Sequence, residues 1–252
     1  IDLWDTGYNY ANFQYAGTEH MGSMWFFSTY LANVTGNWLT GLPNADTLRG
    51  MNLYTGLFVS ALALAGYFFC TRKLKMPGGI AFVGEMAAIS LCWCPTALLY
   101  NYLTYVLFLG SFILLYLGLN KEKKGFLAAA GVLLGANVLV RFSNLPEMAM
   151  IVAVWAYDII VWMEERKGRA GKTAAAAGGP GFWRRVARHT LWCFLGYAVA
   201  LAVLLNYIHV CYGIDAYFEG IARLFSMTDA AVDYKPAAMI LGIVERYVEH
   251  LY

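Results

Sequence analysis

Six segments of this chain approach the ~20 apolar residues that a helix needs to cross the ~30 Å hydrocarbon core of a membrane. Short breaks at about 94–96 and 142–146 separate two pairs of them, a spacing typical of helical hairpins. The sequence therefore predicts an all-α fold, a polytopic transmembrane helical bundle of about six spans. The segments run at about 50–70, 79–97, 100–119, 125–142, 147–163 and 189–210.

Composition excludes an ordinary water-soluble domain. Charged residues make up 13% of the chain and hydrophobic residues 60%, whereas soluble domains carry about 25% charged residues. So few charged residues cannot cover the water-facing surface of a soluble domain of this size. The chain starts at Ile1 without a methionine and ends in a helix-like pattern at Tyr252. We therefore expect it to be a part of a longer polytopic protein.

The basic residues predict the orientation of the spans, because lysine and arginine gather in cytoplasmic loops. They cluster after the first span at 72–75, after the third span at 121–124, and between the fifth and sixth spans at 166–188. These three loops share one side if there are six spans, and that side is expected to be cytoplasmic. The other basic residues lie on or near the opposite, outer side, and they are Arg49, Arg141, Arg223, Lys235 and Arg246.

This orientation divides the chain into five parts. Residues 1–48 form an outer loop, 49–165 hold spans one to five, 166–188 are a basic cytoplasmic linker, 189–210 are the sixth span and 211–252 form an outer segment. Aromatic residues favour the head-group level of a membrane, so we expect interfacial helices on the outer side, at 21–32, 217–227 and 239–252. The aromatic residues of the outer loop are Trp4, Tyr8, Tyr10, Phe13, Tyr15, Trp25, Phe26, Phe27, Tyr30 and Trp38.

Two carboxylates, Asp2 and Asp5, open the outer loop beside aromatic residues. Carboxylates placed three residues apart suit a general base or the binding of a divalent cation. Glu19 and His20 form a second titratable pair in the same loop. The alternative for both pairs is that they are solvated loop residues.

Arg141 and Arg49 are arginines on the side that the basic clusters avoid. Arg141 ends an apolar run, and Arg49 precedes the first span. The planar guanidinium suits phosphate, so together they are candidates to bind the phosphate of a head group. The alternative is that each arginine snorkels to the membrane surface.

Polar side chains also occur within or at the ends of the spans, where ionisable groups usually mark function. Glu85 lies well inside the second span and Asp158 lies one to two turns from the cytoplasmic Glu164. Asp158 therefore either marks a function or reaches the interface. We expect the five cysteines to be packing residues, and no nucleotide-binding or metalloprotease motif is present. No nucleic acid is expected as a partner.

The order of these motifs resembles that of the membrane-embedded GT-C glycosyltransferases of the protein-mannosyltransferase and aminoarabinose-transferase type. An acidic motif at 5–8 is followed by an outer loop of about 40 residues and by Arg49 at the next span. A tyrosine-rich segment at 100–102 then opens the third span, and a glycine-rich segment ends at Arg141. The resemblance covers roughly residues 1–165, and Thr6 stands where the family commonly has glutamate.

The resemblance implies transfer of a sugar from a polyprenyl-phosphate carrier to an acceptor on the outer face of the membrane. It implies that Asp5 is the catalytic base, that Asp2 assists or holds a divalent cation, and that Arg49 and Arg141 bind the lipid phosphate. The expected location is a bacterial plasma membrane. The other candidate substrate-binding residues are Tyr8, Glu19, His20 and Asn144.

Two other functions fit the sequence. A transporter or flippase for a lipid or small solute would use Glu85 and Asp158 as intramembrane carboxylates. A non-catalytic assembly protein of the membrane would need none of these side chains to converge. The transferase hypothesis predicts that the carboxylates at the start of the outer loop lie close to Arg49 and Arg141.

Overall fold

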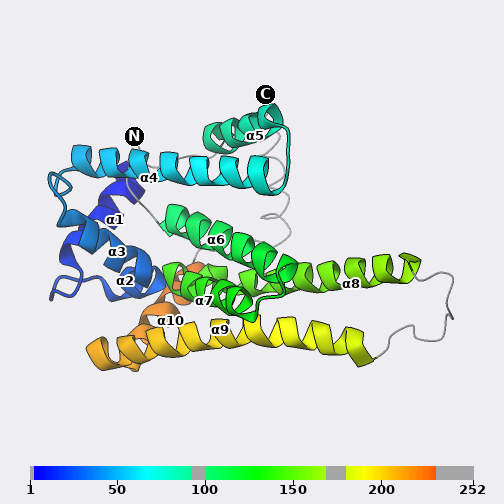
Figure 1. The fold of residues 1–252 in the computed structure, drawn as a ribbon. Coiled ribbons are helices and arrows are strands. Elements are labelled where there is room, and N and C mark those ends of the chain that lie inside the picture. The colour runs from blue at the N-terminus through cyan, green and yellow to red at the C-terminus, as the bar shows by residue number, and fades with distance from the viewer. Residues whose placement is uncertain (1–2, 92–99, 169–179, 231–252) are drawn as a thin grey trace.

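The computed structural model describes residues 3–91, 100–168 and 180–230, which form helices joined by turns, with no strand among them (Figure 1). The expected all-α class is confirmed. In chain order the elements are α1 (Leu3–Tyr15), α2 (Ser23–Ser28), α3 (Tyr30–Thr40), α4 (Leu48–Phe68), the π-helical turn η1 (Phe69–Lys73), α5 (Gly78–Leu91), α6 (Tyr100–Asn120), α7 (Lys124–Val140), the 3-10 segment η2 (Phe142–Met150), α8 (Ile151–Gly168), α9 (Pro180–Tyr212) and α10 (Ile214–Ala230).

Four helical stretches are long and apolar enough to cross a membrane, as expected of an integral membrane protein. They are Leu48–Lys73, Tyr100–Asn120, Phe142–Glu165 and Gly181–Tyr212, and they match the predicted spans at 50–70, 100–119, 147–163 and 189–210. Large apolar side chains cover their outer surfaces, as lipid contact requires. Val210, Leu53, Leu191 and Val203, for example, are all more than 60% exposed.

The two other predicted spans are shorter in the structure. The apolar part of α5 is Gly78–Ala87, and α7 has 17 residues, a rise of ~26 Å at 1.5 Å per residue. Helix α7 ends at Val140 because Arg141 has an extended backbone, with φ −153° and ψ 124°. Of the predicted span at 79–97, residues 92–97 lie outside the described part.

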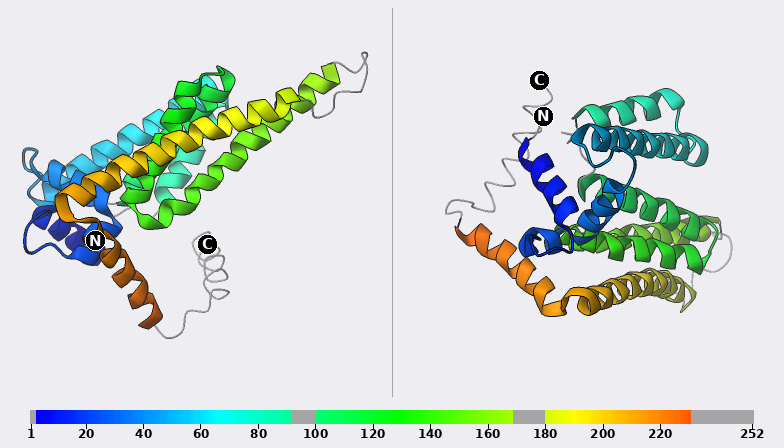
Figure 2. Two further views of the ribbon diagram at one scale, coloured as in Figure 1. Left: turned by 90° about the horizontal axis from the view of Figure 1, so that it is seen from below. Right: turned by 90° about the vertical axis from the view of Figure 1, so that its left-hand side faces the viewer.

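Helix α7 is the centre of the bundle, between α6 on one side and α9 on the other (Figure 2). Its Leu127, Leu134 and Val138 are buried in the main apolar core, which also contains residues of α6 and α9. Close contact with α9 is made at glycines, since the backbones of Gly131 and Gly135 face those of Cys193 and Tyr197. Small residues permit this approach of two membrane helices. A pair formed by α4 and α5 lies beside α6 (Figure 1).

Helices α1, α2, α3 and α10 lie together at one end of the bundle, where α4 and α6 begin and α9 ends (Figure 1). Three aromatic rings that we expected at the membrane surface, those of Phe26, Phe27 and Tyr30, are buried here instead. They pack against Tyr212 and Tyr217 of α9 and α10. Burial raises the pKa of Tyr217 to about 12. The rings therefore hold α10 to α2, and the end of α9 to α2 and α3.

The turns after α4 and α6 lie at the opposite end of the bundle, as do the end of α8 and the start of α9, and these segments carry the described members of the three basic clusters (Figure 1). The predicted linker 166–188 is helical at both of its ends, because α8 continues to Gly168 and α9 begins at Pro180. The predicted interfacial helix at 21–32 falls on α2 and the start of α3, and the one at 217–227 falls within α10. The one predicted at 239–252 lies outside the described residues.

Candidate functional site

Arg141 lies at the end of α7 with its side chain exposed. Its guanidinium carbon is 4.9 Å from the centre of the Tyr100 ring, at the first residue of α6, a cation–π distance. Its backbone N–H still bonds to Asn137 O, at 3.2 Å. Within the described part of the chain, Arg141 makes no salt bridge. The guanidinium is therefore held by an aromatic face and keeps its N–H donors for an anion.

A network of hydrogen bonds fixes the turn that follows Arg141. Asn144 donates to Thr104 Oγ1 at 2.8 Å and to Asn137 O at 3.1 Å. Asn137 in turn donates to Glu147 Oε2 at 2.6 Å. This network joins α6, α7 and η2, and Asn144 is buried within it. Asn144 thus positions Arg141 and has its own N–H donors occupied, while its predicted role in binding substrate stays a prediction.

Sequence reasoning missed Glu147, the acidic member of this network. It follows Pro146, and the helix α8 proper begins only at Ile151. The signal that could have identified it is a carboxylate beside a proline that interrupts a span, since a polar group at the edge of a span needs a partner.

Helices α1 and α4 reach the same end of the bundle through a second apolar cluster. Its buried members are Phe13 of α1, Leu39 of α3, Met51 of α4 and Tyr102 of α6, and Tyr100 packs against them. The partner ring of Arg141 therefore belongs to the cluster that holds α1 and the start of α4 (Figure 1).

The predicted catalytic carboxylates lie at the start of α1. The backbone of Asp5 belongs to the first turn of α1, while its side chain and all of Asp2 lie outside the described residues. Tyr10, further along α1, donates from its hydroxyl to Asp46 O in the turn before α4. Arg49 follows three residues later and is exposed. The elements that carry Asp5, Arg49 and Arg141 thus meet at one end of the bundle.

The remaining predicted residues lie in α1 and the turn after it. The Tyr8 ring packs edge-on to Trp25 with ring centres 5.3 Å apart, and burial raises the pKa of its phenol. Glu19 Oε1 is 3.7 Å from His20 Nε2, and both side chains are exposed. The His20 ring packs against Tyr15. No described contact connects Glu19 and His20 to Arg141, so the structure does not bring them to that site.

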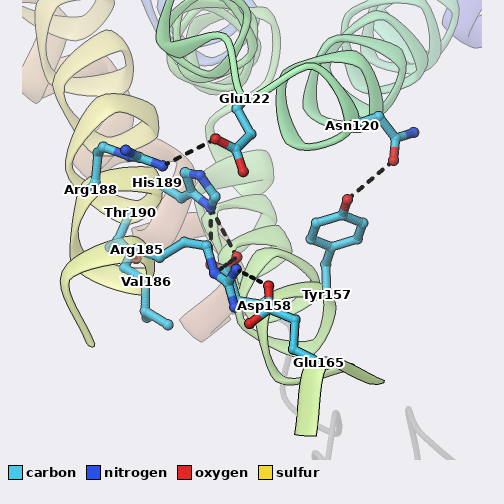
Figure 3. A network of polar contacts seen from close by, with 10 residues as sticks. All are labelled: Asn120, Glu122, Tyr157, Asp158, Glu165, Arg185, Val186, Arg188, His189 and Thr190. Atoms are coloured by element: carbon cyan, nitrogen blue, oxygen red, sulfur yellow. Dashed lines mark hydrogen bonds and ion pairs between the residues drawn. The ribbon is translucent and has the colours of Figure 1, made fainter. Parts of the chain in front are cut away.

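A second polar cluster lies near the opposite end, between α8 and α9 (Figure 3). Asp158 is fully buried, and both of its oxygens are 3.0 Å from His189 Nδ1. Arg185 Nε is 3.6 Å from Asp158 Oδ1, and Arg185 Nη1 bonds to Glu165 at 2.9 Å. Asp158 is therefore not a carboxylate that extends to the membrane surface for solvation. Two residues of α9, Arg185 and His189, are its partners inside the bundle. The missed signal was the i, i+4 spacing of Arg185 and His189, which places both on one helix face.

Other polar candidates have packing contacts. The Glu85 carboxylate rests against Gly66 of α4, where a larger residue would collide with it. Cys193 is buried between α7 and α9, as the packing interpretation expected, and it is a free thiol like Cys70 and Cys211. Across the described ranges no three His, Cys, Asp or Glu side chains gather as a metal site would require. Asp2 and the Asp5 side chain, the proposed cation ligands, fall outside that search.

Comparison with known proteins gives no relative: no protein-family model, no curated protein and no solved structure matches this chain. Function is therefore inferred from the residues and their arrangement.

Proposed function

We propose that this chain is part of a membrane glycosyltransferase that moves a sugar from a polyprenyl-phosphate donor to an acceptor at the Arg141 end of the bundle. The proposal rests on the surroundings of the Arg141 side chain. It is exposed, it stacks on Tyr100, and it forms no salt bridge among the described residues. The motif resemblance over residues 1–165 supports the same activity.

In this proposal the chain crosses a bacterial plasma membrane six times. The four long helices are four of the spans, and the shorter α5 and α7 are the other two. Residues 1–48 lie on the outer side with their short helices near the interface. Support comes from the basic loops, which lie at the end of the bundle opposite α1–α3 (Figure 1), as expected of cytoplasmic loops. Arg141 then lies at head-group depth, where the phosphate of a lipid-linked donor must stay.

The reaction assigns a role to each of four side chains. The oxygen of the acceptor hydroxyl forms a bond to the anomeric carbon of the sugar while the bond from that carbon to the phosphate oxygen breaks. The hydroxyl proton goes to the Asp5 carboxylate. The electron pair leaves with the polyprenyl phosphate, whose growing charge Arg141 and Arg49 stabilise. Tyr8 and its aromatic neighbours offer a face on which a sugar can stack.

Replacing Arg141 with glutamine tests the proposal. We expect the rate of sugar transfer to fall roughly a hundredfold, because a fixed charge at the leaving phosphate is lost. The measurement is transfer from a labelled polyprenyl-phosphate sugar in membranes that contain the intact protein. Arg184→Gln is the matched control, since Arg184 is exposed on α9 far along the chain from this site. An Arg141→Gln protein with the parent rate would refute the role of Arg141.

A transporter is the second candidate, and the buried Asp158–His189 pair favours it. Both residues lie within apolar helices long enough to cross a membrane, and intramembrane ionisable pairs are frequent in proton-coupled transport. Solute-dependent proton uptake by liposomes that contain the protein, abolished in Asp158→Asn, would select this function over the transferase.

A further inference from the structure

A small polar cavity lies at the end of the bundle remote from Arg141. Its volume is about 100 Å³, room for roughly three water molecules at ~30 Å³ each. It opens where the turn between α6 and α7 meets α9. The lining residues are Glu122, Lys124, Leu127, Arg188, His189 and Trp192.

His189 is the buried member of this lining, with 2% of its surface exposed. Its Nδ1 faces both oxygens of Asp158. A carboxylate only accepts hydrogen bonds, so Nδ1 carries a proton, and in the tautomer protonated at Nδ1 alone Nε2 is an acceptor. Nε2 is buried and has no hydrogen-bond partner in the described structure. Figure 3 shows the ring between Asp158 on one side and the Arg188–Glu122 pair on the other, so its Nε2 lies on the cavity side.

Three charged groups form the rim of the cavity. Lys124 Nζ lies 4.9 Å from the centre of the Trp192 ring, and it forms no salt bridge among the described residues. Arg188 Nη2 is 4.0 Å from Glu122 Oε2, and the two side chains are 51% and 68% exposed. That ion pair is long and open to a competing ligand. The cavity therefore offers two cationic donors, Lys124 and Arg188, and two acceptors, Glu122 and His189 Nε2.

An apolar groove adjoins the cavity. Its volume is about 730 Å³, and it shares Glu122 and Lys124 with the polar cavity. Its other lining residues are Leu114, Lys123, Gly125, Phe126 and Ala129. Of these, Leu114, Phe126 and Ala129 form its apolar wall on α6 and α7. A polar cavity continuous with an apolar groove on a membrane protein matches a ligand that has a charged head and an acyl chain.

We propose that this place binds a phospholipid whose head group carries a primary amine, such as phosphatidylethanolamine. Its phosphate accepts from Lys124 and Arg188, its ammonium donates to Glu122 and to His189 Nε2, and one acyl chain lies along Leu114, Phe126 and Ala129. The match rests on charge complementarity. A choline head group has no N–H for the two acceptors, and a glycerol head group has no cation to face Glu122.

Native mass spectrometry of the intact protein tests the proposal with three lipids of identical acyl chains, phosphatidylethanolamine, phosphatidylcholine and phosphatidylglycerol. We expect phosphatidylethanolamine to bind roughly tenfold more tightly than phosphatidylcholine, the effect of one or two charge-assisted hydrogen bonds. Glu122→Gln is expected to remove most of this preference, and Arg188→Gln to weaken the binding of all three lipids. Arg184→Gln, one turn before Arg188 on α9, is the control and is expected to bind like the parent.

Equal binding of the ethanolamine and choline lipids would overturn the proposal, and so would tighter binding of phosphatidylglycerol, which would indicate a plain anion site. An unchanged preference in Glu122→Gln would also refute it. Glu122 and Arg188 are exposed, so these variants are expected to fold, which circular dichroism checks. The outcome is independent of sugar transfer, because the two sites lie at opposite ends of the bundle.

Discussion

A Gly131→Leu protein is expected to lose the packing of α7 on α9 and to unfold far more easily than the parent. A β-carbon at position 131 would collide with the carbonyl oxygen of Cys193 and lie 2.9 Å from Tyr197 N. Both are backbone atoms of α9, so no side chain can move aside and the helices must separate. Overpacking of a core costs about 1–3 kcal/mol, and we expect about 3 kcal/mol or more here because two backbones meet.

The control for this variant is Gly125→Leu, on the same helix, where an added β-carbon has no neighbour within 4 Å. Thermal unfolding in detergent, followed by circular dichroism, compares the two. We expect the Gly131→Leu midpoint to fall by roughly 10 °C and the Gly125→Leu midpoint to stay near that of the parent. Equal midpoints for the two variants would show that α7 and α9 do not pack at Gly131.

Asp158→Ala is expected to destabilise the protein by about 3–5 kcal/mol, the usual cost of removing one partner of a buried ion pair, here that of Asp158 with Arg185. Asp158 and His189 are both almost fully buried. Without the carboxylate, His189 Nδ1–H loses its acceptor and Arg185 loses one of its two ion-pair partners, although Arg185 keeps its bond to Glu165. The penalty comes from donors left unpaired in an apolar setting.

Glu164→Ala is the matched control for this prediction, because Glu164 is an exposed carboxylate on the same helix. Unfolding by a chemical denaturant in mixed micelles measures the loss. A double replacement, Asp158→Leu with His189→Leu, removes donor and acceptor together and is expected to cost less than Asp158→Ala. If Asp158→Ala were as stable as Glu164→Ala, the buried pair would not hold α8 to α9.

The helix lengths show how far apolar runs predict this fold. Helix α6 was expected at 100–119 and is found at Tyr100–Asn120, since its ends coincide with the ends of the apolar run. Helix α9 was expected at 189–210 and begins nine residues earlier, at Pro180. The added turns contain Arg185 and Arg188, whose partners are Asp158, Glu165 and Glu122. An apolar run cannot reveal a helix stabilised by charges from other elements.

The candidate site was predicted only in part, because some of its contacts also come from other elements of the chain. Arg141 stood out because an isolated cation at the outer edge of a span is unusual, and the structure places it on Tyr100. His189 was missed because it directly follows the predicted basic linker and its partner is 31 residues away. The burial of Phe26 likewise depends on Tyr212 of α9. Contacts between distant segments decide these cases, and a local pattern does not identify the distant partner.

Transfer of a labelled sugar from a polyprenyl-phosphate donor by an Asp5→Asn protein is the most direct test of the proposed activity. Asparagine keeps the size of the side chain but cannot take the proton of the acceptor hydroxyl. We expect transfer to fall by at least roughly a hundredfold, the lower range for loss of a general base, with helix content and unfolding midpoint unchanged. Transfer at the parent rate by this variant would contradict the assignment of a glycosyltransferase site to the start of α1.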